Sequence, residues 1–151
     1  MSENPATTDP RPKILVVEDE QILQDVLARL LEDAGYQTTI AGSAEDTLSL
    51  LDKEGFDLLV IDLMLPGMGG LELLRTVKGR DPDHVAVMIT AFGSVESAVQ
   101  AMKEGAFHYL TKPFRHEEVL LTIRNALSQR NLVSENRALR QALSWRARSG
   151  E

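Results

Sequence analysis

Polar side chains that could bind a metal ion or a phosphate group follow four short apolar runs of this 151-residue sequence. Glu18, Asp19 and Glu20 follow the run at residues 14–17, and Asp62 follows residues 58–61. Thr90 follows residues 85–89, and Thr111, Lys112 and Pro113 follow residues 107–110. Short apolar runs bounded by polar residues are typical of buried strands. The sequence therefore predicts that these polar side chains stand at the ends of strands.

The chemistry of this set is that of a hard cation and a phosphate. Carboxylates from two neighbouring strand ends repel one another in a partly desolvated cleft, so they must share protons or hold a cation. All-oxygen ligands favour Mg²⁺ or Mn²⁺, which leaves an open face for phosphate. Such an ion, together with the Lys112 ammonium and the Thr90 hydroxyl, would make an acidic pocket attractive to phosphate.

Each residue also has an ordinary structural role. A lone Asp after a strand usually caps a helix or forms a turn, but Pro66 and Gly67 intervene before a helix can begin after Asp62. Thr90 could cap a turn, and Lys112 alone would be a solvated lysine. Their combination favours a functional site. The remaining candidates for metal ligands are the three histidines, His84, His108 and His116. Their spacing is not that of metal ligands, so we expect them to be ordinary residues of the surface or of a sheet edge.

The elements that must position these side chains are strands that alternate with amphipathic helices. Apolar residues at helical spacing predict five helices, which begin near Ile22, Ser43, Gly70, Ser94 and His116. Parallel strands need such crossover helices, so the pattern predicts an α/β fold with a doubly wound parallel sheet. Ligand sites of these sheets lie at the carboxyl ends of the strands, where the polar residues stand. Gly69 and Gly70 are expected to admit a close backbone approach or to start a helix.

Composition limits the possible functions. The chain is 43% apolar, enough for one core, and it contains no cysteine, which excludes disulfides and thiol chemistry. It shows neither a membrane-spanning run nor a secretory leader, so we expect a cytoplasmic protein that does not act at a membrane. Residues 1–123 hold 10 basic and 21 acidic residues, a charge of −11, whereas residues 124–151 hold 6 and 2, a charge of +4. The acidic part is not expected to bind nucleic acid.

The last predicted helix carries a short heptad pattern. Leu132, Leu139 and Leu143 fall at d, d and a, and Asn136 falls at the a position between them, where a buried Asn commonly fixes a two-stranded register. This pattern covers only about two heptads, fewer than a firm coiled-coil prediction needs. The helix is therefore either a parallel dimer linker or a solvated extension of the core.

The motifs VVEDE, VIDLMLPGMGG, MITAFGS and YLTKPF, in this order, resemble the receiver domain of response regulators in bacterial two-component signalling. The resemblance covers residues 13–127. It implies the flavodoxin-like (βα)5 fold with strand order 2-1-3-4-5, here with an extended C-terminal helix. Residues 1–12 are expected to be a disordered segment, 128–145 a helical or coiled-coil dimerisation linker, and 146–151 a disordered tail.

The resemblance also implies a role for each site residue. Asp62 would accept a phosphoryl group from a histidine of a sensor histidine kinase, and Asp19, Asp62 and the backbone carbonyl of Met64 would bind Mg²⁺, with Glu18 reaching the ion through water. Lys112 would pair with the carboxylate and then with the phosphoryl oxygens, and the bond from Lys112 to Pro113 would be cis. Thr90 and Tyr109 would form the switch, although Tyr109 alone could be a half-buried aromatic residue of an edge strand. The domain would assist its own phosphotransfer and dephosphorylation without being an enzyme.

The stretch AFGSVESAVQAMKEGAFHYLTKPF resembles the subgroup of receivers attached to sigma-54-dependent transcription activators. It implies a homodimer through the fourth helix, the fifth strand and the C-terminal helix. No GxxxxGK[ST] phosphate loop or DNA-reading helix pair is present, so we expect a regulatory fragment rather than a stand-alone regulator. The alternatives are a flavodoxin-like redox protein, for which EDEQ has the wrong charge, a haloacid-dehalogenase-type phosphatase, which needs an acid where Met64 stands, and a degenerate receiver that only binds proteins.

Overall fold

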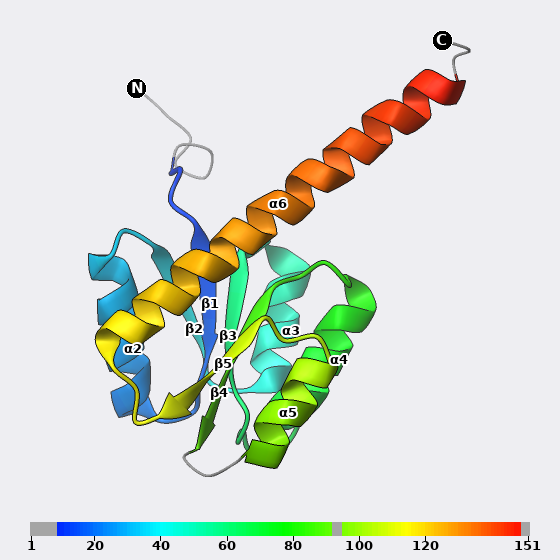
Figure 1. Cartoon of the computed structure of the whole chain (residues 1–151). Helices are drawn as coiled ribbons and strands as arrows, with labels where there is room; N and C mark the ends of the chain where they lie inside the picture. The colour runs from blue at the N-terminus through cyan, green and yellow to red at the C-terminus, as the bar shows by residue number, and fades with distance from the viewer. Residues whose placement is uncertain (1–8, 92–94, 149–151) are drawn as a thin grey trace.

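Five parallel strands form one sheet in the order β2-β1-β3-β4-β5, and a long helix extends beyond it (Figure 1). The computed structural model describes residues 9–91 and 95–148, with side chains described as far as residue 143. The strands are β1 (Lys13–Val17), β2 (Gln37–Ala41), β3 (Leu58–Asp62), β4 (Ala86–Ala91) and β5 (His108–Lys112). The helices are α2 (Gln21–Asp33), α3 (Ala44–Lys53), α4 (Gly70–Arg80), α5 (Val95–Lys103) and α6 (His116–Arg148). The predicted fold, strand order and C-terminal helix are confirmed.

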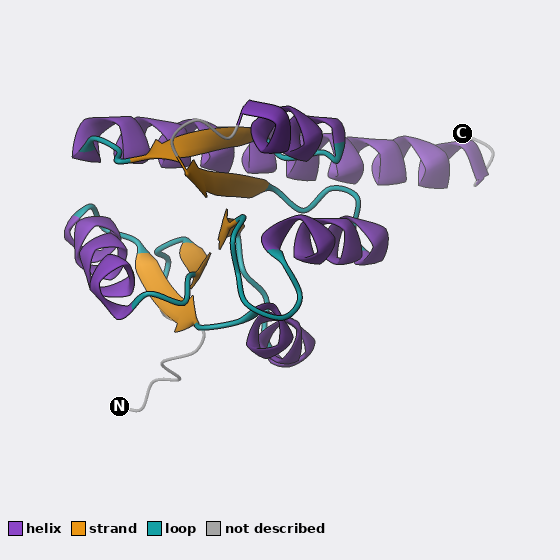
Figure 2. Cartoon of the chain, turned by 90° about the horizontal axis from the view of Figure 1, so that it is seen from below, coloured by secondary structure: helices purple, strands orange, loops and turns teal. Residues whose placement is uncertain are grey.

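Helices cover both faces of the sheet (Figure 2). Successive strand residues point to opposite faces, so each strand supplies two cores. One core joins the sheet to α2 and α6 through Leu27, Leu31 and Ile123, and the other joins it to α3, α4 and α5. Strands that are buried on both sides need apolar residues at every position, which explains the continuous apolar runs of the sequence.

The strands extend further than these runs predicted. Asp62 is the last residue of β3, as the sequence predicted. Thr90, expected to end its strand, is followed in β4 by Ala91, and Lys112, expected to follow its strand, is the last residue of β5. Val85 and Phe107 precede β4 and β5 instead of starting them. Backbone pairing continues past the last apolar side chain, since Thr90 pairs with Thr111 and Ala91 with Lys112. The ladder therefore fixes the backbone of the polar residues themselves.

Gly70, the first residue of α4, lies against the end of β3. A Cβ atom at this position would stand 2.2 Å from the carbonyl oxygen of Asp62 and 2.8 Å from the Cα of Leu63. Both atoms belong to the backbone, so no side-chain rotation could relieve the overlap. The predicted close approach is confirmed at Gly70, where the absence of a side chain lets α4 begin directly beside Asp62.

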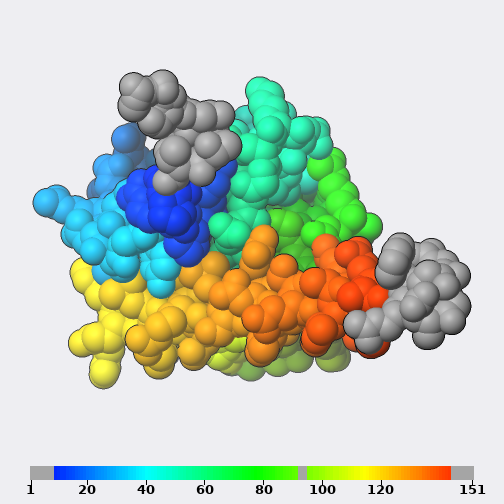
Figure 3. Space-filling view, turned by 90° about the horizontal axis from the view of Figure 1, so that it is seen from above, coloured from blue at the N-terminus to red at the C-terminus, as the bar shows by residue number. Residues whose placement is uncertain are grey.

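Helix α6 has a buried part and an extension. Val119, Ile123 and Ala126 are buried in the core. Further along, Arg130 pairs with Asp57 at 3.3 Å, and Arg137 pairs with Asp81 at 3.5 Å and with Asp83. Figure 3 shows α6, in yellow to red, along one side of the molecule. The helix continues to Arg148, so residues 146–148 are helical where a disordered tail was predicted, because no residue there breaks the helix. Residues 149–151 lie outside the described part.

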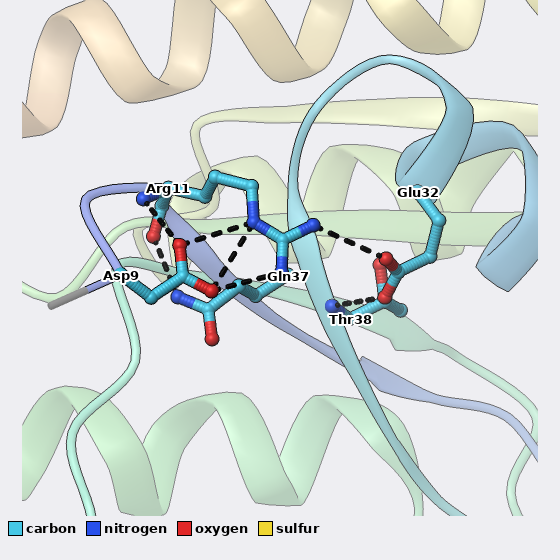
Figure 4. Close-up of polar contacts among 5 residues, drawn as sticks. All are labelled: Asp9, Arg11, Glu32, Gln37 and Thr38. Carbon is cyan, nitrogen blue, oxygen red and sulfur yellow. Dashed lines mark hydrogen bonds and ion pairs between the residues drawn. The ribbon is translucent and has the colours of Figure 1, made fainter. Parts of the chain in front are cut away.

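The N-terminal segment is held where it is described. Arg11 binds Asp9 through two nitrogens and approaches Glu32 of α2 at 3.6 Å (Figure 4). Gln37 of β2 donates its backbone N–H to Pro12 and its side chain to Arg11. The carbonyls of Arg11 and Pro12 therefore find donors on β2, and the disorder expected over residues 1–12 stays a prediction. Residues 1–8 are outside the described range. Among the described residues, no helix combines the length and apolar character that crossing a membrane requires.

Candidate functional site

Three acidic side chains converge at the carboxyl ends of β1 and β3. Glu18 and Asp19 come from the turn after β1, and Asp62 ends β3, the strand beside it. One carboxylate oxygen of each residue lies within 4.8 Å of one from each of the others. Glu18 and Asp62 are buried, whereas Asp19 is exposed. The structure thus brings together the acids that the sequence predicted to meet.

Lys112 places its ammonium group among these acids. Its Nζ donates a hydrogen bond to Asp62 Oδ2 at 3.0 Å, and it lies 3.7 Å from Glu18 Oε1 and 3.8 Å from Glu20 Oε1. The Lys112–Pro113 bond is cis, as the family resemblance implied. The other oxygen of Asp62, Oδ1, accepts the backbone N–H of Met64 at 3.0 Å. Both oxygens of Asp62 therefore have fixed donors.

Burial shapes the electrostatics of the site. It raises the pKa of Glu18 to about 7, and the neighbouring Asp62 carboxylate acts in the same direction, against the Glu20 N–H and the Lys112 charge. Burial of Lys112 disfavours its charge, but its hydrogen bond to Asp62 and the surrounding acids outweigh this effect and raise its pKa. The site is therefore one ammonium group facing more carboxylate charge than it can balance.

The residues present fit a divalent cation. Glu18 Oε1 is buried and accepts no hydrogen bond from any described residue, although it lies beside Asp62. A buried carboxylate oxygen that accepts no hydrogen bond and lies among other carboxylate oxygens is an environment suited to Mg²⁺. Asp19, Asp62 and Glu18 supply the carboxylates, and the backbone of Met64 contacts the Asp62 carboxylate through its N–H. Of the described residues, only these three acids form a group of His, Cys, Asp and Glu side chains suited to a metal.

The two expected switch residues lie on β4 and β5. Thr90 is buried in β4, and its hydroxyl donates to the carbonyl of Ala91 at 3.2 Å, so it points along its own strand. Tyr109 on β5 is 36% exposed, and its ring centroid lies 5.5 Å from that of His108. The three histidines stand in separate elements, namely the loop before β4, β5 itself and the first turn of α6.

Two further residues lie near the site, namely Glu20, for which the sequence indicated no separate role, and Gln24, which no sequence pattern indicated. Glu20 shares Lys112 with the other acids, and Gln24 of α2 donates its side-chain amide to the Glu18 carbonyl at 2.6 Å. The sequence already grouped Glu20 with Glu18 and Asp19, but nothing in it indicated the contact of Glu20 with Lys112. Gln24 has no such indication, because a glutamine on a helix is ordinarily solvated.

Comparison with known proteins agrees with this geometry. Residues 14–124 match the model of the response regulator receiver domain. The chain is 34% identical over 131 residues to the C4-dicarboxylate transport transcriptional regulatory protein DctD of Rhizobium meliloti, covering 87% of this chain and 28% of that protein. It is 40% identical over 118 residues to the response regulator protein FleR of Pseudomonas aeruginosa, covering 78% and 25%.

Solved structures give the same result. NtrX from Brucella abortus superposes with a TM-score of 0.82 at 34% identity, over 85% of this chain and 30% of that one. A response regulator receiver domain protein from Clostridium thermocellum superposes with a TM-score of 0.77 at 31% identity, over 81% and 98%. Because the family model matches residues 14–124, well over half of the chain, the chain belongs to the family of response regulator receiver domains.

Proposed function

We propose that Asp62 accepts a phosphoryl group from a histidine of a sensor histidine kinase, with Mg²⁺ bound beside it. The observation that carries this proposal is the 3.0 Å contact from Lys112 Nζ to Asp62 Oδ2 next to the three-acid cluster. Receiver domains are regulatory phosphoacceptor domains, and they bind Mg²⁺ at an acidic pocket of this kind. Asp19, Asp62 and the Met64 carbonyl would hold the ion directly, and Glu18 through water.

The chain's own residues define the transfer. An oxygen of Asp62 attacks phosphorus while the bond from phosphorus to the imidazole nitrogen breaks, and the electron pair of that bond stays with nitrogen. The Lys112 ammonium, which now contacts Asp62, would pair with the phosphoryl oxygens as negative charge develops on them. The Met64 N–H holds the carboxylate in place. Bound Mg²⁺ supplies additional positive charge at these oxygens. Dephosphorylation is the attack of water on phosphorus, which releases the Asp62 carboxylate.

Phosphorylation would act on the neighbouring strands. A phosphoryl group on Asp62 adds acceptor oxygens at an edge where the Thr90 hydroxyl now donates only to Ala91. Rotation of Thr90 toward the new oxygens would free space beside β5, and Tyr109, which is partly exposed there, would repack. Thr90 and Tyr109 are therefore the proposed switch.

The extension of α6 supports a role as a dimer linker. Arg130 and Arg137 form ion pairs with the receiver. Leu132 and Leu139 each come two residues after one of these arginines, so they point about 200° around the helix axis from the arginines. Leu132, Leu139 and Leu143 are 57%, 62% and 62% exposed. One face of the extension is thus bound by the receiver, while the leucine face is directed away from it and is available to a second copy.

The output is proposed to be transcription activation of the sigma-54-dependent type. The relatives named above are transcriptional or response regulators, and the chain spans about a quarter to a third of their length. The homodimer would use α5, β5 and α6, the elements that the sequence resemblance implied. Phosphorylation would then change the geometry of the linker that leads to the output module.

The decisive experiment measures the incorporation of phosphate from a small acyl phosphate donor in the presence of Mg²⁺. We expect one phosphate per wild-type chain, none in Asp62→Asn, and none when EDTA removes the metal. Asp33→Asn, at the exposed end of α2, is the matched control and should be labelled like the wild type. Labelling of Asp62→Asn, or labelling that does not need a divalent ion, would contradict the proposal and would favour a domain that only binds proteins.

The dimer linker makes a separate prediction. Leu139→Lys should shift the sedimentation of the chain toward the monomer, because it places a charge at the centre of the apolar stripe. Ala138→Lys adds the same charge outside the stripe and should leave the oligomeric state unchanged. Sedimentation would be compared with and without beryllofluoride, which mimics the phosphoryl group. A wild-type monomer in both states would refute the linker hypothesis.

A further inference from the structure

The side chain of Gln24 in α2 contacts the turn that carries Glu18 and Asp19, and no sequence motif indicated this contact. We propose that Gln24 is a positioning residue, which holds the Glu18–Asp19 peptide so that both carboxylates face Asp62. The inference deepens the proposed function, because it concerns how the same site becomes able to bind a divalent cation.

The turn itself has few other constraints. The Glu18 N–H donates to the Ala41 carbonyl at 3.0 Å, which is the last backbone contact between the end of β1 and β2. Glu20 precedes α2 as its N-cap residue but makes no capping hydrogen bond with its side chain. Its N–H donates instead to Glu18 Oε2 at 3.1 Å. Between these points, the carbonyl of Glu18 is held by the Gln24 side chain.

Gln24 contacts both ends of the turn. Its side-chain Nε2 donates to the Glu18 carbonyl at 2.6 Å, and its backbone N–H donates to the Glu20 carbonyl at 2.9 Å. A peptide unit is planar, so fixing the Glu18 carbonyl also fixes the amide of Asp19 and the position of the Asp19 Cα, from which the side chain leaves the backbone. Gln24 is half-buried, which shields this bond from water.

The acids need such a restraint because they repel one another. Asp19 is exposed, so packing does not hold its carboxylate near Asp62. Without the Gln24 bond, the turn could relax and carry Asp19 away from the cluster when no cation is bound. A restrained turn keeps the oxygens within 4.8 Å in advance, so that less ordering is needed when the ion binds.

The test compares two glutamines of the same helix. Gln24→Met keeps the length and helix propensity of the side chain but removes its donor. Gln21→Met makes the same exchange at an exposed residue whose side chain forms no hydrogen bond to any other described residue. Mg²⁺ affinity would be measured by calorimetry on the full chain. We expect Gln24→Met to bind Mg²⁺ about tenfold more weakly, the lower range for the loss of a group that orients metal ligands.

A second readout needs no metal. In metal-free protein, hydrogen exchange at the Glu20 amide should be faster in Gln24→Met than in the wild type, because the carboxylate that this amide binds belongs to the loosened turn. Gln21→Met should leave both the affinity and the exchange unchanged. Thermal unfolding of metal-free Gln24→Met checks that the fold is retained.

The outcomes separate this inference from the proposed function. Equal Mg²⁺ affinity of Gln24→Met and wild type, within twofold, overturns the positioning role, as does an equal loss in Gln21→Met. A lower melting temperature with unchanged affinity also overturns it, since Gln24 would then only stabilise the fold. If the wild-type chain itself fails to bind Mg²⁺, the proposed function falls, and the positioning of the turn is then decided by the exchange of the Glu20 amide alone.

Discussion

Lys112→Met is expected to reduce the rate of Asp62 phosphorylation by at least about 100-fold, the usual effect of removing one preorganised donor from a site of developing charge. In the structure, Lys112 Nζ is the only ammonium group within 4 Å of Asp62 among the described residues. Methionine has a similar length and apolar stem, so the substitution removes the charge with little change in volume. The phosphoryl oxygens would then face Glu18 and Asp19 without this cation.

The measurement is the initial rate of phosphate incorporation from a small donor at saturating Mg²⁺. Lys103→Met is the control. It removes the same charge at the exposed end of α5, at a position far in the sequence from the acids of the site, and should react like the wild type. Circular dichroism would verify that Lys112→Met is folded. A rate within tenfold of the wild type would show that Lys112 pairs with Asp62 only to stabilise the resting domain.

Gly70→Ala is expected to lower the free energy of unfolding by about 3 kcal/mol, near the upper end of the usual cost of overpacking. The added Cβ would stand 2.2 Å from the Asp62 carbonyl oxygen, and relief requires that α4 move away from β3. The same movement would displace the backbone that carries the phosphoacceptor. We therefore expect both the stability and the phosphorylation of this variant to fall.

Gly79→Ala in the same helix is the control for Gly70→Ala. No described atom lies within 4 Å of a Cβ at Gly79, so alanine there should raise the stability by about 0.4–1 kcal/mol by restricting the unfolded chain. Urea unfolding of both variants measures the difference. Equal stability of Gly70→Ala and the wild type would mean that α4 can shift at little cost, and that the close approach of α4 to Asp62 is not needed.

The sequence by itself determined the fold class, because strands buried on two sides must be apolar throughout and the intervening helices must carry an apolar stripe. It also determined which side chains meet, since the carboxyl ends of parallel strands share one edge of the sheet. Glu18, Asp19, Asp62 and Lys112 could be assembled for that reason alone. Strand direction follows from the alternating pattern of strands and helices, whereas the strand order came from the family resemblance.

Only the tertiary structure decided which contacts form between segments of the chain that no local sequence pattern links. Gln24 reaches the Glu18 carbonyl, Gly70 touches Asp62, and Arg137 binds the loop at Asp81 and Asp83. It also decided that β4 and β5 continue to Ala91 and Lys112. A hydrogen bond or a close approach depends on atomic distances after packing, whereas the periodicity of a sequence records only which face of each element is buried.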